Sequence, residues 1–168
     1  MRNVKLKFVG INSNFRPVIK VDGQIIKAKK NEFGSYEADY NTDNDNVEIS
    51  IERNLELNAK LWWLYVIISF IISIFGLFEP PYDKRCIVID CKFNVKLNDT
   101  NEIKLKFNTM NSQGKAVEIE TQNQVDEIKN EYYVDKKAKT KRNIITLIKI
   151  LIWLVLIIGI IFFISEKI

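Results

Sequence analysis

The chain has 168 residues and a formal net charge of +4, which leaves room for one ordinary domain and excludes a large enzyme fold. It contains two cysteines and no histidine, so histidine general bases, Ser/His or Cys/His nucleophile pairs and imidazole zinc sites are excluded within one copy. Its apolar residues gather in two long blocks, which separate segments that are mainly polar.

Residues 1–60 form the first polar segment, which has the alternating pattern of half-buried strands. Short runs of alternating apolar and polar residues are separated by turn residues. Asp22 and Gly23 favour the positive φ angles of a two-residue hairpin turn, which makes this hairpin the strongest local prediction. The pattern predicts five strands, over residues 4–8, 17–21, 24–29, 35–40 and 47–53.

The rhythm of these strands, a PVIKVDG hairpin followed by a GSYEADY strand, resembles in outline small immunoglobulin-like or prealbumin-like bacterial β-sandwich modules. The resemblance covers roughly 55 residues and rests on the spacing of the strands. It implies a small sandwich of two sheets as the fold of the polar part of the chain.

Residues 61–78 form the first apolar block, which carries no charge. As a helix the block would be about 27 Å long, at ~1.5 Å per residue, which is close to the thickness of the hydrocarbon core of a bilayer. Trp62, Trp63 and Tyr65 lie near its start and are typical of an aromatic belt at a membrane interface. The block therefore predicts a first transmembrane helix.

Residues 79–124 form the second polar segment. Pro80 and Pro81 end any preceding helix, because proline lacks a backbone donor and disfavours helical geometry in the residue before it. Period-two alternation then returns, divided by turn residues. It predicts three more strands, at residues 86–97, 102–107 and 116–121. The predicted total is then about eight short strands.

Residues 125–143 are predicted to form a basic juxtamembrane helix that runs on into the second apolar block. A cation cluster directly before a membrane segment normally stays in the cytoplasm and attracts anionic lipid, at about 1 kcal/mol per charge. Nucleic acid is not predicted as a partner, because no aromatic residues interleave with the cations. The cluster consists of Lys136, Lys137, Lys139, Lys141 and Arg142.

Residues 144–164 form the second apolar block, which predicts a second transmembrane helix followed by a short tail at 165–168. Lys149 is the one charge inside the block. Its side chain is expected to reach back toward the lipid headgroups, because a long lysine side chain can do so from about one and a half turns inside the helix. The alternative is a contact with an acidic helix of a partner protein.

Two crossings would put both termini on one side of the cell membrane and residues 79–143 on the other. The flanking cations favour a cytoplasmic position for residues 79–143. This arrangement exports the first 60 residues although residues 1–10 lack the apolar run of a secretory signal. In the alternative, residues 61–78 enter one leaflet and return, which leaves all the strands together in the cytoplasm as one sandwich. Two crossings are preferred, because a straight helix satisfies its own backbone in lipid.

Four side chains have part of the spacing of a calcium-binding loop. Asn41, Asp43, Asp45 and Glu52 stand at its positions 1, 3, 5 and 12. Asn46 replaces the glycine required at position 6, and strands rather than helices flank the segment. A polar hairpin loop is therefore the preferred interpretation, and a weak cation site is the alternative.

Cys86 and Cys91 are five residues apart, so on one strand their side chains point to opposite faces and do not bridge. Their spacing also differs from that of a C-x-x-C redox motif. They are predicted to be small buried residues, with a metal site or a disulfide between chains as the alternatives.

We therefore expect a mainly β protein with two transmembrane helices, no cofactor and no catalytic or metal site. The predicted function is a non-enzymatic, membrane-anchored interaction or accessory module, whose partners are the lipid bilayer and an unidentified protein. One alternative is a subunit of a membrane enzyme or transport assembly that oligomerisation completes. Another is a transmembrane envelope sensor, which requires the two polar segments to lie on opposite sides of the membrane.

Overall fold

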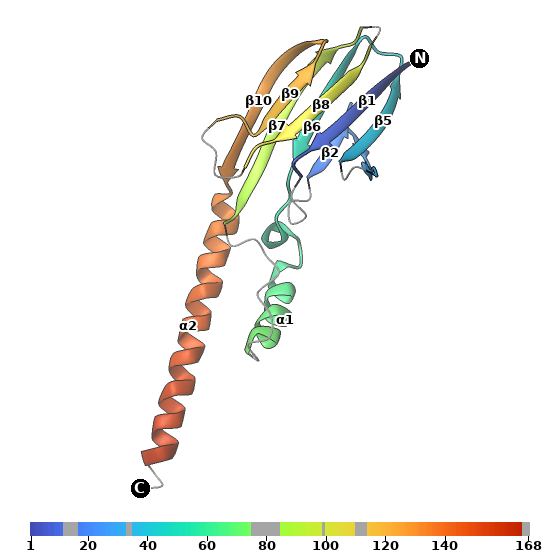
Figure 1. The fold of residues 1–168 in the computed structure, drawn as a ribbon. Helices are drawn as coiled ribbons and strands as arrows, with labels where there is room; N and C mark the ends of the chain where they lie inside the picture. The colour runs from blue at the N-terminus through green and yellow to red at the C-terminus, as the bar shows by residue number, and fades with distance from the viewer. Residues whose placement is uncertain (12–16, 33–34, 75–84, 99, 110–113, 166–168) are drawn as a thin grey trace. The chain divides into compact units, whose positions relative to one another are not determined.

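The computed structural model describes residues 1–11, 17–32, 35–74, 85–98, 100–109 and 114–165 (Figure 1). The chain divides into two compact units. Residues 1–54 and 87–133 form the first, here called the β unit. Residues 55–86 and 134–168 form the second, here called the helical unit.

The β unit consists of two five-stranded sheets that share one apolar core. In chain order the strands are β1 (Arg2–Val9), β2 (Val18–Val21), β3 (Gln24–Ile26), β4 (Lys29–Lys30), β5 (Tyr36–Thr42), β6 (Asn46–Glu52), β7 (Ile87–Lys96), β8 (Glu102–Phe107), β9 (Val117–Thr121) and β10 (Gln124–Val134). Sheet A has the order β4-β5-β1-β8-β9, and sheet B has the order β10-β7-β6-β2-β3 (Figure 1). The chain is thus mainly β, as the alternating pattern predicts.

Alternation along the central strands explains the core. Every second residue of β6 and β7 is buried, and the two strands place Ile49 opposite Phe93. Both of these side chains are fully buried. Each large apolar side chain that leaves water in this way contributes about 1.5–3 kcal/mol to folding. The outward residues form cross-strand ion pairs, such as Lys104 with Glu120 at 2.7 Å, which keep the outer faces soluble.

Strands from the two polar segments lie side by side in both sheets. In sheet A, β1 runs parallel to β8, from Lys5 opposite Glu102 to Val9 opposite Lys106. In sheet B, β6 runs antiparallel to β7 over seven residue pairs. Residues before and after the first apolar block therefore build one core. The preferred prediction from the sequence instead places these two segments on opposite sides of the membrane.

The hairpin between β2 and β3 confirms the strongest local prediction. Asp22 has a φ of 48° and Gly23 a φ of 76°, as a two-residue hairpin turn of this type requires. Asp22 also accepts a hydrogen bond from the backbone N–H of Glu48 at 2.9 Å, which ties the turn to β6.

The helix predicted over residues 125–143 is wrong for its first ten residues, which belong to strand β10. Tertiary contacts override the helical preference of the local composition. Val125 and Tyr132 pack against the core, and the Tyr132 hydroxyl donates to the Asn108 carbonyl at 3.0 Å. The Asn130 amide accepts from the backbone N–H of Val117 and donates to its carbonyl, at 2.9 and 2.7 Å.

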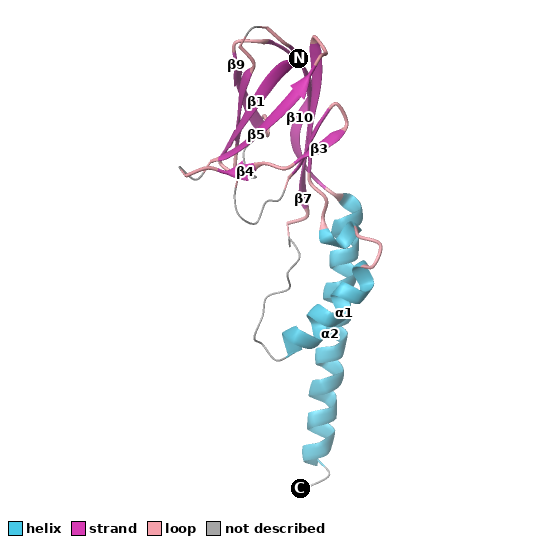
Figure 2. Cartoon of the chain, turned by 90° about the vertical axis from the view of Figure 1, so that its right-hand side faces the viewer, coloured by secondary structure: helices cyan, strands magenta, loops and turns pink. Residues whose placement is uncertain are grey.

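The helical unit contains a short 3-10 helix and two α-helices, drawn in cyan in Figure 2. The 3-10 helix η1 spans Glu56–Asn58, α1 spans Trp62–Ile74 and α2 spans Lys136–Ser165. Among the described residues, α2 alone is long and apolar enough to cross a membrane. The structure thus identifies a candidate membrane span in the second apolar block, whereas residues 75–78 of the first block lie outside the described residues.

Helix α2 begins at Lys136, so the basic cluster forms its first turns, and the helix continues into the apolar block as predicted. Asp135 caps the helix, because its side chain accepts from the backbone N–H of Ala138 at 3.0 Å and its carbonyl accepts from Lys139 at 2.9 Å. This cap sets the point where β10 ends and the helix starts.

Candidate functional site

The five cations of the basic cluster do not have the same surroundings. Lys136, Lys137 and Lys139 are exposed, whereas Lys141 and Arg142 are partly buried. The Arg142 guanidinium donates to the Asn143 side chain at 2.9 Å. Of the five cations, Lys136, Lys137 and Lys139 are therefore the most accessible to lipid headgroups.

Lys141 holds parts of the helical unit together. Its ammonium donates to the carbonyl of Leu57 at 2.7 Å and lies 4.9 Å from the centre of the Trp62 ring. A cation over an aromatic ring contributes about 0.5–1 kcal/mol at an exposed site and more where water is excluded. Lys141 and Trp62 thus have an internal role that the sequence did not indicate.

The cap of α2 adds a second link to η1. The Asn58 side chain donates to the second carboxylate oxygen of Asp135. Partial burial acts to raise the pKa of Asp135, but the hydrogen bonds from Ala138 and Asn58 outweigh it, and the pKa is lowered. The carboxylate therefore stays ionised at the N-terminus of α2, where the helix dipole favours a negative charge.

The predicted interfacial aromatics differ from one another. Trp62 contacts Lys141, whereas Trp63 is half-exposed at the start of α1. The backbone of Tyr65 belongs to α1, but its side chain lies outside what the structure describes.

Lys149 lies on a particular face of α2. It follows the buried Ile145 by four residues, and Ile145 follows the buried Ala138 by seven, so all three share one side of the helix. Lys149 is itself partly buried, in contrast to the exposed residues around it. This position suits a polar contact as well as a side chain that reaches the headgroups.

The side chains with calcium-loop spacing have other partners. Asp43 pairs with the N-terminal ammonium at 3.0 Å, and Asp45 pairs with Arg2. Glu52 pairs with Lys20 at 2.8 Å, and the Asn41 oxygen accepts from the amide of Asn3. No group of three or more His, Cys, Asp or Glu side chains that could hold a metal ion occurs among the described residues.

Both cysteines are buried thiols. Burial raises the pKa of Cys91 to about 12, and the nearby carboxylates of Glu127 and Asp90 add to the increase. Because the thiolate is the reactive form, Cys91 is suited to packing rather than to redox chemistry.

We expect Cys91 to react with Ellman's reagent at pH 8 only after unfolding. A thiol with a pKa near 12 has about one part in ten thousand as thiolate at that pH, against about a quarter in an unfolded chain. The reaction of the native protein should rise only as the pH approaches 12. The measurement uses a Cys86→Gly variant, because Cys86 has a φ of 54°, which glycine adopts without strain. Rapid labelling of this folded variant at pH 8 would contradict the burial of Cys91.

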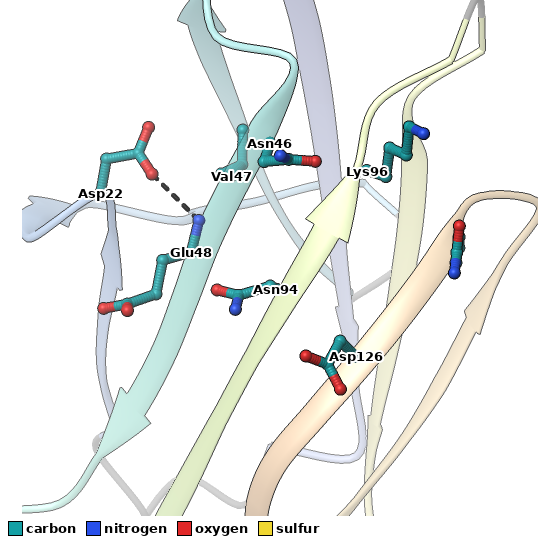
Figure 3. A pocket seen from close by; sticks show the side chains of 8 residues that line it. Asp22, Asn46, Val47, Glu48, Asn94, Lys96 and Asp126 are labelled. Atoms are coloured by element: carbon teal, nitrogen blue, oxygen red, sulfur yellow. Dashed lines mark hydrogen bonds between the residues drawn. The ribbon is translucent and has the colours of Figure 1, made fainter.

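A hollow on the outer face of sheet B has no counterpart among the sequence predictions (Figure 3). Its volume is about 440 Å³, and its walls come from the β2–β3 turn and from β6, β7 and β10. Polar residues alternate with buried ones on these strands, so their side chains point outward together. The lining residues are Asp22, Asn46, Val47, Glu48, Asn94, Lys96, Gln124 and Asp126.

Comparison of the chain with models of protein families, with curated proteins and with solved structures finds no significant match.

Proposed function

We propose that the chain is a non-enzymatic, membrane-anchored interaction module, with α2 as its one membrane span and the β unit in the cytoplasm. The residues of α2 from Thr146 to Ser165 are exposed, apart from Lys149 and Ile152, which are partly buried. Most of this stretch is apolar, and an apolar surface of this size is unfavourable in water and favourable in lipid. A bilayer is therefore the partner that suits this helix.

The pairing of β6 with β7 is the main support for the proposal that α2 alone crosses the membrane. These strands stand on either side of the first apolar block in the sequence, yet they are hydrogen-bonded neighbours in one sheet. A net crossing by residues 61–78 would separate them by the thickness of the bilayer. The pairing therefore argues against two crossings and supports the alternative in which this block enters one leaflet and returns.

The same pairing argues against an envelope sensor. That function requires residues 1–60 and 79–124 to lie on opposite sides of the membrane, whereas strands from both segments belong to each of the two sheets. We do not propose it.

The orientation follows from the cations beside α2. Five precede the apolar block, and Lys167 is the one that follows it in the sequence. Because cations remain on the cytoplasmic side, this asymmetry favours a cytoplasmic β unit and an outer C-terminus.

Edge strands support an interaction role. Strand β3 has three residues and lies at one edge of sheet B, and its Ile25 is 67 % exposed. Strand β10 lies at the opposite edge and exposes Ile128. Apolar side chains on edge strands are suited to a partner chain that extends a sheet.

Labelling of introduced cysteines tests the orientation. We expect Gln24→Cys and Gln122→Cys, on either side of the first apolar block, to react with a membrane-impermeant maleimide only after cells are permeabilised. Ser165→Cys, at the end of α2, should react in intact cells. The wild-type chain is the control for Cys86 and Cys91, which are both buried. Different labelling of the two glutamine variants would restore two crossings, and labelling of both in intact cells would reverse the orientation.

Affinity purification in a mild detergent separates the proposal from its rival. A stable partner protein in fixed ratio supports an interaction module. A homo-oligomer that shows enzymatic or transport activity by itself would instead support a subunit completed by oligomerisation, in which Lys149 would line the shared contact.

A further inference from the structure

The hollow on sheet B gathers several unpaired polar side chains in one place. Many lysines and acidic residues elsewhere on the sheet surfaces form cross-strand pairs, as Lys129 does with Asp90 at 2.7 Å and Lys106 with Glu118 at 2.9 Å. Within the part of the chain that the structure describes, five side chains of the hollow have no hydrogen-bond or ion-pair partner. They are Asn46, Asn94, Lys96, Gln124 and Asp126.

The hollow carries three carboxylates, of Asp22, Glu48 and Asp126, against the one ammonium of Lys96, so its net charge is modestly negative. Asp22 accepts hydrogen bonds from three donors, and Glu48 pairs with Lys92 at 2.8 Å, so these two carboxylates are already engaged. Lys96, Asp126 and three amides are the groups that remain available. A site with this balance does not favour an anionic ligand.

The arrangement of these groups suits many simultaneous hydrogen bonds. Figure 3 shows Asn94 on β7 between Glu48 on β6 and Asp126 on β10, so three neighbouring strands contribute to one surface. Amides both donate and accept, Lys96 donates, and Asp126 accepts. The volume of about 440 Å³ lies within the range of small-molecule sites.

We propose that this hollow binds a neutral ligand rich in hydroxyl groups, namely a sugar, either as a free oligosaccharide or as the headgroup of a glycolipid. A sugar hydroxyl donates one hydrogen bond and accepts others, which matches the mixture of amides, one ammonium and one carboxylate. The proposal does not depend on the orientation of the protein in the membrane.

The test follows backbone amide NMR signals of the full chain in a detergent without a sugar headgroup, because a maltoside would occupy the site. Maltose, lactose and N-acetylglucosamine are titrated separately, and nanodiscs with a hexosyl-diacylglycerol form the second arm. We expect saturable shifts at β6, β7 and the start of β10. Shifts with the free sugars identify a soluble ligand, and shifts with the glycolipid alone identify a headgroup.

A matched pair of double variants gives the control. Asn94→Ala with Asp126→Ala should weaken binding about tenfold or more, because each lost hydrogen bond contributes about 0.5–1.5 kcal/mol. Asn41→Ala with Asp39→Ala makes the same chemical change on β5 of the other sheet and should leave the affinity unchanged. No saturable shift with any of these ligands would overturn the proposal. Equal losses in both double variants, or tighter binding of glycine or lysine than of sugars, would overturn it too.

Discussion

Replacing Ile49 with alanine should lower the free energy of unfolding of the β unit by about 2–5 kcal/mol. Ile49 is fully buried in the middle of β6, where it stands opposite Val21 on β2 and Phe93 on β7. The substitution removes apolar contacts with both neighbours and leaves a cavity that the packed core fills only in part. A loss of this size is a large fraction of the stability of a typical domain, which is about 5–15 kcal/mol.

The measurement is urea unfolding of the full chain in detergent, followed by far-ultraviolet circular dichroism in the region of the β signal. Ile25→Ala is the matched control, because Ile25 is also an isoleucine of sheet B but is 67 % exposed on β3. Its effect should stay within about 0.5 kcal/mol. Equal destabilisation by the two variants would contradict the position of Ile49 in the core.

Ending the chain at Asn143 should release the protein from membranes on extraction with alkaline carbonate, whereas the full chain should stay in the membrane fraction. The shortened chain lacks the apolar part of α2, in which each Leu, Ile or Val contributes about 0.3–0.6 kcal/mol to insertion. It keeps the basic start of α2 and the whole of α1. In our proposal the first apolar block enters one leaflet without crossing, so we expect its attachment to be lost on carbonate treatment.

The shortened chain must be shown to fold before its location is interpreted. Its β unit should keep the circular dichroism and the unfolding midpoint of the full chain, because the strands end before α2 begins. A folded, shortened chain that stays with the membrane after carbonate treatment would contradict the single span. It would indicate that the first apolar block anchors the protein.

Sequence periodicity predicts local features of this fold well. The β2–β3 hairpin follows from Asp22 and Gly23, and most strands lie where alternation places them. The parallel pairing of β1 with β8 is different, because it joins residues almost a hundred positions apart and has no local signal. Strand β10 was missed for a related reason, since contacts made by Val125 and Tyr132 with the core determine its conformation.

For the candidate sites too, some features are visible in the sequence and others depend on contacts between residues far apart in the chain. The basic cluster is visible in the sequence, but the separate role of Lys141 depends on the Leu57 carbonyl, 84 residues earlier. The burial of Cys86 and Cys91 agrees with the prediction, but the strand argument does not apply to Cys86, which precedes β7 and has a φ of 54°. The hollow on sheet B requires the order β10-β7-β6, which no pattern within one strand supplies.

The pairing of Asn130 with Val117 has a consequence for assembly. The Asn130 carboxamide donates one hydrogen bond to Val117 and accepts one from it, so it imitates the peptide group of an additional strand and occupies the hydrogen-bonding positions that Val117 would otherwise present. Docking of a foreign strand there would first have to displace this internal substitute. Pairing with a foreign strand, including unwanted polymerisation, should therefore avoid Val117 of β9 and begin at another sheet edge, such as β3.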